Sequence, residues 1–139
     1  MIVRPVTQED VPACAAIVRR WLDSIDWMPA SPSEAELRGY LAEGFPNREV
    51  WVYGTPAEGY LSLDPERCHI SGFYVAEPGR GRGRALLDRA KSGRTRLSLN
   101  SHEANEQAHR FYAREGFVEV ARGLEGNDGI PEIRMEWRA

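Results

Sequence analysis

A run of alternating glycine and arginine carries the clearest chemical signal in the chain. It spans residues 79–84 and separates a strand-like segment from a helical one. Glycines let the backbone approach a ligand closely and point successive N–H groups at it, and the start of a helix adds a partial positive charge. Charge-assisted donors come from four arginines in or near the run: Arg80, Arg82, Arg84 and Arg89. The segment therefore predicts a cradle for a phosphate-bearing ligand.

Two common phosphate-binding loops do not fit this run. It is not a Walker loop, because no Gly-Lys-Ser/Thr follows it. It is a poor dinucleotide fingerprint, because the strand before it belongs to an antiparallel meander and no βαβ unit opens there. By itself, the run could also be a solvated basic turn.

The elements before the run predict two helices and then a change to strands. Apolar residues recur at three- and four-residue steps from Val11 to Ile25, which predicts a helix ending near Ser24. Ser33 and Glu36 form a capping box for a second helix that runs through Glu43 and ends at Gly44. Two strands at 50–53 and 60–63 flank turn residues and predict a hairpin, and residues 68–75 predict a third antiparallel strand.

The elements after the run alternate between helix and strand. Helices are predicted at 85–91 and 103–115, and strands at 96–99, 117–120 and 133–137. With a short first strand at residues 2–3, the order is βααβββαβαββ. This order predicts a single α+β domain over residues 1–139, with a mixed, mostly antiparallel sheet flanked by helices.

Composition limits the partners of this domain. The 139 residues include 42% hydrophobic and 28% charged residues and carry a net charge of −3. An acidic balance is unusual for a protein that coats nucleic acid, so the local basic run suggests a discrete anion. No apolar run approaches the about 18 residues of a membrane span, and residues 1–5 are typical of a strand rather than a signal peptide. We therefore expect no nucleic-acid or membrane partner and a cytoplasmic location.

The two cysteines predict no special chemistry. Cys14 lies in a helical apolar pattern and Cys68 leads into a strand. We expect two reduced, partly buried thiols, with no disulfide framework. No metal site is predicted.

A second motif gives the run its context. Residues 105–112 read Asn-Glu-Gln-Ala-His-Arg-Phe-Tyr and are followed by Gly116-Phe117. This segment resembles the Asn-x-x-Ala-x-x-x-Tyr signature of the GNAT superfamily of acyl-CoA N-acyltransferases. The family's loop, Q/R-x-x-G-x-G/A, follows a strand that ends in a hydrophobic residue such as Val75. The ending at 129–137 also looks like the last strand of many members, so the resemblance covers nearly the whole chain.

The register of the loop motif has two readings. Read without gaps from Val75, the loop matches as Arg80-x-x-Gly83-x-Ala85. Read backward from the helix pair Leu86-Leu87, the last motif glycine is Gly83 and the Q/R position falls on Pro78. Both readings use the backbone of residues 80–84, so the site is the same and the individual contacts stay open.

The resemblance implies an enzyme that uses acetyl-CoA in a GNAT-like fold. The pyrophosphate would lie on Arg80, Gly81, Arg82, Gly83, Arg84 and Ala85. The pantetheine arm would pair with free backbone groups between the strands ending at Val75 and Leu99, held by Asn105 and Ala108. A backbone N–H near Tyr74 or Val75 would polarise the thioester carbonyl. Tyr112 would be the general acid for the leaving thiolate, and a primary amine would attack directly in a ternary complex.

The acceptor side is less defined. Asp26, Trp27 and Met28, together with Trp21 and the loop at 122–130, are predicted to line the acceptor pocket, and Asp26 beside Trp27 would suit a cationic amine. The general base is not assigned. Its candidates by position are Glu58, Asp64, His69 and Glu103, whereas His102 and His109 are expected at the surface.

Two alternatives stay open at this point. A non-catalytic acyl-CoA-binding domain of the same fold would not need Tyr112. A nucleic-acid binder acting through residues 79–84 would show strongly salt-dependent binding. The acceptor of the enzyme is expected to be a small-molecule or peptide amine, and the chain could be a monomer or a homodimer.

Overall fold

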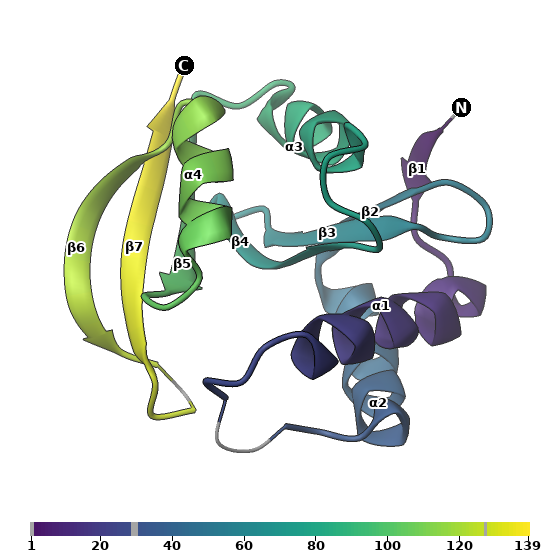
Figure 1. Cartoon of the computed structure of the whole chain (residues 1–139). Coiled ribbons are helices and arrows are strands. Elements are labelled where there is room, and N and C mark those ends of the chain that lie inside the picture. Colours follow the sequence, from purple (N-terminus) through teal and green to yellow (C-terminus); the bar gives the residue numbers. More distant parts are fainter. Residues whose placement is uncertain (1, 29–30, 127) are drawn as a thin grey trace.

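The computed structural model describes residues 2–28, 31–126 and 128–139, which form a seven-stranded sheet with two helices against each face (Figure 1). The strands are β1 (Val3–Pro5), β2 (Glu49–Tyr53), β3 (Gly59–Asp64), β4 (His69–Val75), β5 (Arg96–His102), β6 (Val118–Glu125) and β7 (Pro131–Arg138). The α-helices are α1 (Val11–Asp23), α2 (Glu34–Gly44), α3 (Arg82–Lys91) and α4 (Glu106–Arg114), with short 3₁₀ turns η1 (Gln8–Asp10) and η2 (Phe45–Asn47). The predicted α+β class is confirmed. In the described part of the chain, no helix combines the length and apolar character needed to cross a bilayer.

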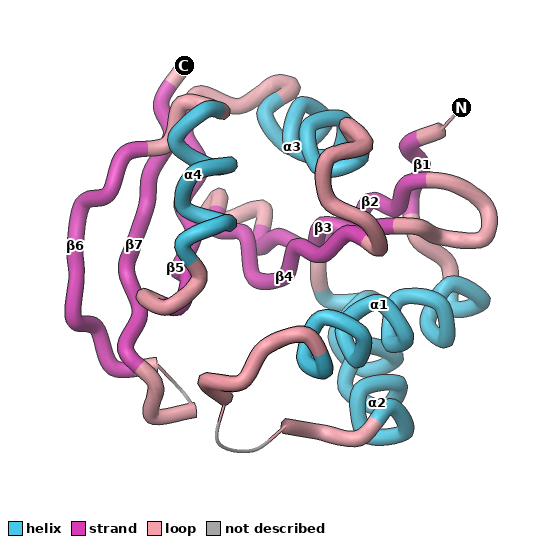
Figure 2. The backbone as a smooth tube through the Cα atoms, in the orientation of Figure 1, coloured by secondary structure: helices cyan, strands magenta, loops and turns pink. Residues whose placement is uncertain are grey.

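The sheet opens in its middle. Its order is β1-β2-β3-β4-β5-β7-β6, and β4 and β5 are its one parallel pair among the described strands. They pair at only two positions, His69 with Ser98 and Ile70 with Leu99. Ser71 is an extra residue of β4, because its neighbours pair with consecutive residues of β3. Such a bulge bends the strand, and beyond it β4 and β5 diverge (Figure 2).

The core lies on both faces of the sheet. One cluster packs under α1 and α2 and includes Cys14, Ala15, Val52 and Tyr60. The other packs under α3 and includes Leu61, Leu63, Leu86, Leu87, Leu97 and Leu99. Successive residues of a strand point to opposite faces, so β3 alone supplies Tyr60 to one cluster and Leu61 to the other. Both helix pairs are thereby fixed relative to the opening between β4 and β5.

Local capping sets where the helices begin. The predicted capping box of α2 is confirmed: the Glu36 N–H donates to Ser33 Oγ at 3.1 Å and the Ser33 N–H donates to Glu36 Oε1 at 3.0 Å. Two predicted starts were wrong. The helix α3 begins at Arg82 rather than residue 85, because Gly81 caps it, and α4 begins at Glu106 rather than residue 103, because Asn105 caps it.

The two cysteines are free thiols, as predicted. Cys14 is fully buried on the inner face of α1, and burial raises the pKa of its thiol to about 12. The thiol therefore stays protonated and unreactive at neutral pH.

Candidate active site

A cleft of about 850 Å³ lies where β4 and β5 diverge. It is bordered by the end of β4, residues 77–81, the first turn of α3, the end of β5 and one side of α4. Nearly all residues predicted to hold the cofactor line it: Tyr74, Val75, Arg80, Gly81, Arg82, Gly83, Arg84, Asn105 and Ala108, together with the predicted acid Tyr112. Ala85 lies outside this lining. The fold thus brings the two signature segments to one site.

The end of β4 presents free backbone groups to the cleft. The Ala76 N–H donates to the Glu58 carbonyl at 2.8 Å, and the antiparallel register with β3 continues back along β4. Because pairing alternates along an antiparallel strand, Tyr74 directs its N–H and C=O toward β3, whereas Phe73 and Val75 direct theirs toward the cleft. Of the two N–H groups predicted near the thioester, that of Val75 faces the cleft and that of Tyr74 faces β3.

The glycine loop and the start of α3 form an anion cradle. Gly79 and Gly81 adopt positive φ angles of 84° and 78°, a conformation that favours glycine. The first helical bond of α3 runs from the Ala85 N–H to the Gly81 carbonyl at 3.1 Å, so the N–H groups of residues 82–84 have no partner within the helix. Free N–H groups at a helix N-terminus are typical of phosphate-binding sites, and their contact with a diphosphate stays a prediction.

The arginines of the loop contribute less than their number suggests. Arg82 pairs with Glu58, and its Nη1 atom is buried without a hydrogen-bond partner among the described residues. Arg80 pairs with Glu77 at 3.3 Å in an exposed position. The guanidinium of Arg89 lies 4.1 Å from the ring centroid of Trp51, outside the cleft lining. Two of the four arginines therefore pair with glutamates and a third stacks on a tryptophan outside the cleft, whereas the N–H groups of residues 82–84 have no partner within the helix.

Gly83 has a packing role that the sequence did not reveal. A Cβ atom built there would lie 3.3 Å from the Cζ atom of Phe111 on α4. This contact is tighter than ordinary van der Waals packing. The missing side chain therefore lets the first turn of α3 approach α4 across the cleft.

Tyr112 lies on α4 among three phenylalanine rings. Its ring centroid is 6.2 Å from that of Phe73, 5.5 Å from Phe111 and 5.6 Å from Phe117. Burial in this aromatic setting raises the pKa of Tyr112 well above that of a free phenol. Its hydroxyl has no hydrogen-bond partner among the described residues. Tyr112 therefore offers a neutral hydroxyl on the cleft wall that is free to donate a hydrogen bond to a ligand.

Asn105 is the N-cap of α4. Its Oδ1 atom accepts from the Ala108 N–H at 3.3 Å, and both residues line the cleft. The cap fixes the first turn of the helix that carries Tyr112. A contact between Asn105 and a bound cofactor stays a prediction.

The opposite end of the cleft is built from aromatic and acidic residues. Trp21 of α1 lines it, and the ring centroid of Trp27 lies 5.9 Å from that of Trp21. Asp26 is exposed and Met28 packs against the core beneath α1 and α2, so neither lines the cleft. Of the four side chains predicted for the acceptor pocket, Trp21 therefore lines the cleft and Trp27 lies beside it.

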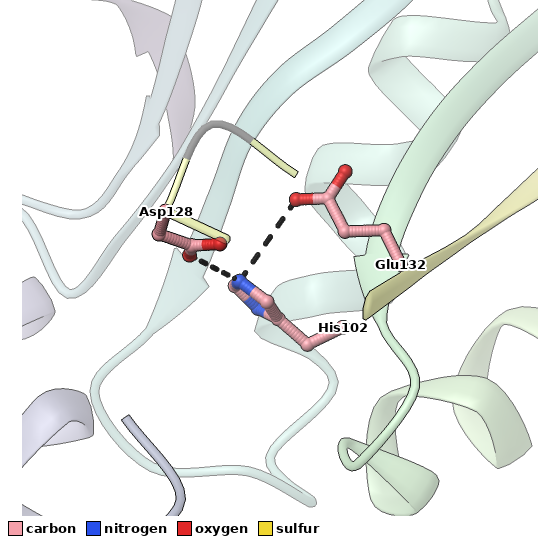
Figure 3. A group of neighbouring side chains, drawn as sticks. All are labelled: His102, Asp128 and Glu132. Carbon is pink, nitrogen blue, oxygen red and sulfur yellow. Dashed lines mark hydrogen bonds and ion pairs between the residues drawn. The ribbon is translucent and has the colours of Figure 1, made fainter. Parts of the chain in front are cut away.

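His102 is the central residue of this end (Figure 3). Its Nε2 atom lies 2.8 Å from Asp128 Oδ2 and 3.9 Å from Glu132 Oε2. The Ile130 N–H donates to Asp128 Oδ1 at 3.0 Å, and Asn100 Nδ2 donates to Glu132 Oε1 at 3.3 Å. Burial raises the pKa of Asp128, but the hydrogen bonds from His102 and Ile130 outweigh it, so the pKa lies below its usual range.

Placing His102 at the surface was wrong, because only 19% of its side chain is exposed and it lines the cleft. The alternation of side chains along β5 indicates on which face of the sheet His102 lies. Leu97 and Leu99 point into the core under α3, so residues 98, 100 and 102 point to the other face. Asp128 belongs to the loop at 122–130 that was predicted for the acceptor pocket, whereas the approach of Glu132 had no comparable signal in the sequence.

The four predicted base candidates lie outside the cleft lining. His69 contacts Ser98 Oγ at 2.8 Å, and burial lowers its pKa. Asp64 Oδ1 accepts the Glu66 N–H at 3.0 Å within a turn. Glu103 accepts the Gly123 N–H at 2.9 Å, and Glu58 pairs with Arg82. Each of these side chains has a structural partner instead.

Comparisons with known proteins agree with this geometry. The family model described as an acetyltransferase (GNAT) domain matches residues 26–139. The peptidyl-lysine N-acetyltransferase YjaB of Salmonella typhimurium is 27% identical over 134 residues, covering 93% of this chain and 91% of that protein. The solution structure of apo YjaB from Escherichia coli has a TM-score of 0.77 at 24% identity, covering 97% of this chain and 95% of that one.

A structural neighbour was solved with the cofactor. It is yncA, a putative acetyltransferase from Salmonella typhimurium with its cofactor acetyl-CoA, with a TM-score of 0.67 at 20% identity, covering 98% of this chain and 92% of that one. We expect the free backbone groups of β4 and the cradle at α3 to hold this cofactor. This chain is therefore a GNAT-family acetyltransferase that uses acetyl-CoA.

Proposed function

We propose that the protein transfers the acetyl group of acetyl-CoA to a primary amine of the lysine side-chain class, by direct attack while both substrates are bound. The observation that carries the proposal is the cleft itself. It has Tyr112 on the wall formed by α4 and a pocket with Trp21, His102 and Glu132 at the opposite end. Two substrates can therefore meet between β4 and β5 without a covalent enzyme intermediate, and neither cysteine lines the cleft.

The donor side of the cleft would hold acetyl-CoA and polarise its thioester carbonyl. When bound, acetyl-CoA supplies an activated thioester. The N–H groups of residues 82–84 would hold its diphosphate, and those of Phe73 and Val75 would pair with its pantetheine arm and acyl carbonyl. A fixed N–H aimed at the carbonyl stabilises the negative charge that develops on its oxygen.

Tyr112 would assist departure of the sulfur. Its raised pKa keeps the phenol neutral throughout the physiological range. Because a thiol has an ordinary pKa of about 8.5, complete proton transfer from such a phenol is uphill. The contribution of Tyr112 is then chiefly a hydrogen bond that strengthens as charge develops on sulfur.

The acceptor class has two supports. The relative YjaB is named as a peptidyl-lysine N-acetyltransferase, and the pocket around His102 combines carboxylates with tryptophan rings, which suits an alkylammonium group. The nucleic-acid alternative loses support, because Arg80 and Arg82 already pair with glutamates.

The test is a thiol-release screen with acetyl-CoA. The panel contains a lysine peptide with a blocked N-terminus, a peptide whose only amine is its N-terminus, and a polyamine. We expect the lysine peptide to be acetylated fastest. Melting curves with about millimolar acetyl-CoA run alongside, because a ligand of the folded state raises the melting temperature. A raised melting temperature without turnover of any amine would instead support a non-catalytic acyl-CoA-binding domain.

A further inference from the structure

The proposed reaction needs a proton acceptor for the incoming amine. A lysine side chain has an ordinary pKa of about 10.4, so near neutral pH it is an ammonium ion without a lone pair. Attack on a carbonyl requires removal of one proton first. Among the described residues that line the cleft, His102 is the one imidazole, and it lies at the end opposite the diphosphate cradle.

We propose that His102, oriented by Asp128, takes this proton in a pocket that selects a cationic primary amine. The proposal rests on the function proposed above. It assigns a catalytic role to His102 and a positioning role to Asp128. Glu132, 3.9 Å from His102 Nε2, supplies a second negative charge on the same side of the imidazole.

The hydrogen bond to Asp128 selects the tautomer of the imidazole. An ionised carboxylate can only accept, so Nε2 of His102 carries the hydrogen in the 2.8 Å contact. Asp128 cannot turn away freely, because its other oxygen accepts the Ile130 N–H. In the neutral imidazole, Nδ1 then holds the lone pair, and it has no hydrogen-bond partner among the described residues. This is the arrangement by which a carboxylate prepares an imidazole to act as a base.

The surrounding loop is shaped around the carboxylates. A Cβ atom at Gly126 would lie 2.6 Å from Glu132 Oε2 and 2.9 Å from the Ile130 carbonyl, so only glycine fits there. Gly126 therefore lies directly against Glu132, and Asp128 contacts His102 beside it (Figure 3).

Aromatic rings complete the pocket for a cation. The Trp21 ring stacks near His102 with centroids 6.4 Å apart, and the Trp27 ring lies 5.0 Å from it. Tryptophan faces attract alkylammonium groups, and the carboxylates of Asp128 and Glu132 add net negative charge. An ammonium on an alkyl arm is therefore favoured over a neutral or anionic acceptor.

The protons balance. The ammonium gives one proton to Nδ1 of His102, and the freed nitrogen lone pair forms the new C–N bond as the C–S bond breaks. The nitrogen then loses a second proton, and the departing sulfur gains one at the Tyr112 side. His102 later returns its proton to solvent. The sum is one ammonium and one thioester giving one amide, one thiol and one released proton.

The kinetic test compares His102→Gln and Asp128→Asn with matched controls outside the cleft, His69→Gln and Asp64→Asn. With a lysine peptide near pH 7, kcat/KM should fall at least about 100-fold in His102→Gln and about tenfold in Asp128→Asn. The controls should stay within about twofold of wild type. The defect of His102→Gln in kcat/KM should become smaller as the pH approaches the pKa of the lysine side chain, about 10.4, because the substrate then deprotonates unaided.

Other titratable groups face His102, so the pH series is also measured on variants of these residues. They are Asp128 and Glu132 on the β6–β7 side, Tyr74 on β4, whose pKa is raised by burial, and His109 on α4, which donates to the His102 carbonyl at 3.0 Å. A defect of His102→Gln that stays constant with pH would mean a structural role and would overturn the proposal.

A second readout does not depend on turnover. Nitrogen NMR of the imidazoles, assigned with the single His→Gln variants, should show His102 as the Nε2–H tautomer. This tautomer should lose its preference in Asp128→Asn. Finding the Nδ1–H tautomer in wild type contradicts the proposal. Inactivity of wild type toward every amine would defeat the proposed function, whereas an active wild type with a near-normal His102→Gln would defeat only this inference.

Discussion

The two ends of the cleft are built by different means. The donor end consists of the β4 terminus, the glycine loop with the first turn of α3, and α4, and it offers mostly backbone N–H groups. The acceptor end consists of side chains from α1, β5, the β6–β7 loop and β7: Trp21, Trp27, His102, Asp128 and Glu132. In the proposed reaction, the donor end meets acetyl-CoA, and the acceptor end must distinguish one amine from another.

This difference predicts how each end responds to substitution. A site made of backbone groups depends on glycine conformations and helix starts, and it tolerates changes of nearby side chains. A site made of side chains can be altered one residue at a time while the strands and helices stay in place. Acceptor specificity can therefore change without loss of the cofactor site.

The largest effect is expected where the two ends meet. Tyr112→Phe removes only the hydroxyl, so the ring still fills the space between Phe73 and Phe117. We expect kcat to fall about 100-fold, within the range typical of acid–base catalysis, with acetyl-CoA affinity unchanged. The measurement is steady-state thiol release with one accepted amine, together with melting curves. Unchanged kcat, with chemistry shown to limit the rate, removes Tyr112 from the mechanism.

Next in size is a change to the donor-end backbone. Gly81→Ala forces a side chain onto a φ of 78°, which costs about 1–2 kcal/mol. Because this conformation caps α3 and aims its N–H groups, we expect about tenfold weaker acetyl-CoA binding by calorimetry.

The matched control for this change is Gly39→Ala, inside α2, where a Cβ would contact nothing within 4 Å. It should leave binding unchanged and stabilise the protein by up to about 1 kcal/mol. Equal binding by both variants would show that the conformation of Gly81 does not matter.

A smaller effect should separate the two ends. Trp21→Leu removes an aromatic face worth about 1 kcal/mol to a bound cation. We expect KM for a lysine peptide to rise about fivefold while the Kd of acetyl-CoA stays constant. Trp51→Leu is the control, since Trp51 stacks with Arg89 outside the cleft. Equal losses of both ligands in Trp21→Leu would mean that the ends are not independent.

The smallest effect is expected at an arginine that the sequence made prominent. Arg80 is exposed and its pair with Glu77 spans 3.3 Å in solvent, where ion pairs contribute about 0–1 kcal/mol. Arg80→Ala should change acetyl-CoA affinity by less than about threefold. A loss larger than that of Gly81→Ala would show that side-chain charge, rather than the backbone, captures the diphosphate.

Much of the fold could be predicted, because its signals are local. The apolar spacing from Val11 to Ile25, the Ser33–Glu36 box and the hairpin of β2 and β3 each depend on neighbouring residues. The opening of the sheet was less accessible. The bulge at Ser71 and the two-residue pairing of β4 with β5 arise from contacts between distant segments.

The sequence by itself determined the family and the cofactor, and it predicted the segments that now meet at the donor end, because a glycine loop at a helix start and a signature along one helix are contiguous in the chain. Trp21, Trp27 and the loop at 122–130 were predicted from the sequence for the acceptor end, but only the tertiary structure brought His102 and Glu132 to them. His102, Asp128 and Glu132 approach one another only after β5 and β7 pair and the β6–β7 loop folds over Glu132. Tertiary structure also pairs Arg82 with Glu58 and places Gly83 close to Phe111. Side-chain convergence is a property of strand pairing and loop closure, and no local spacing in the chain encodes it.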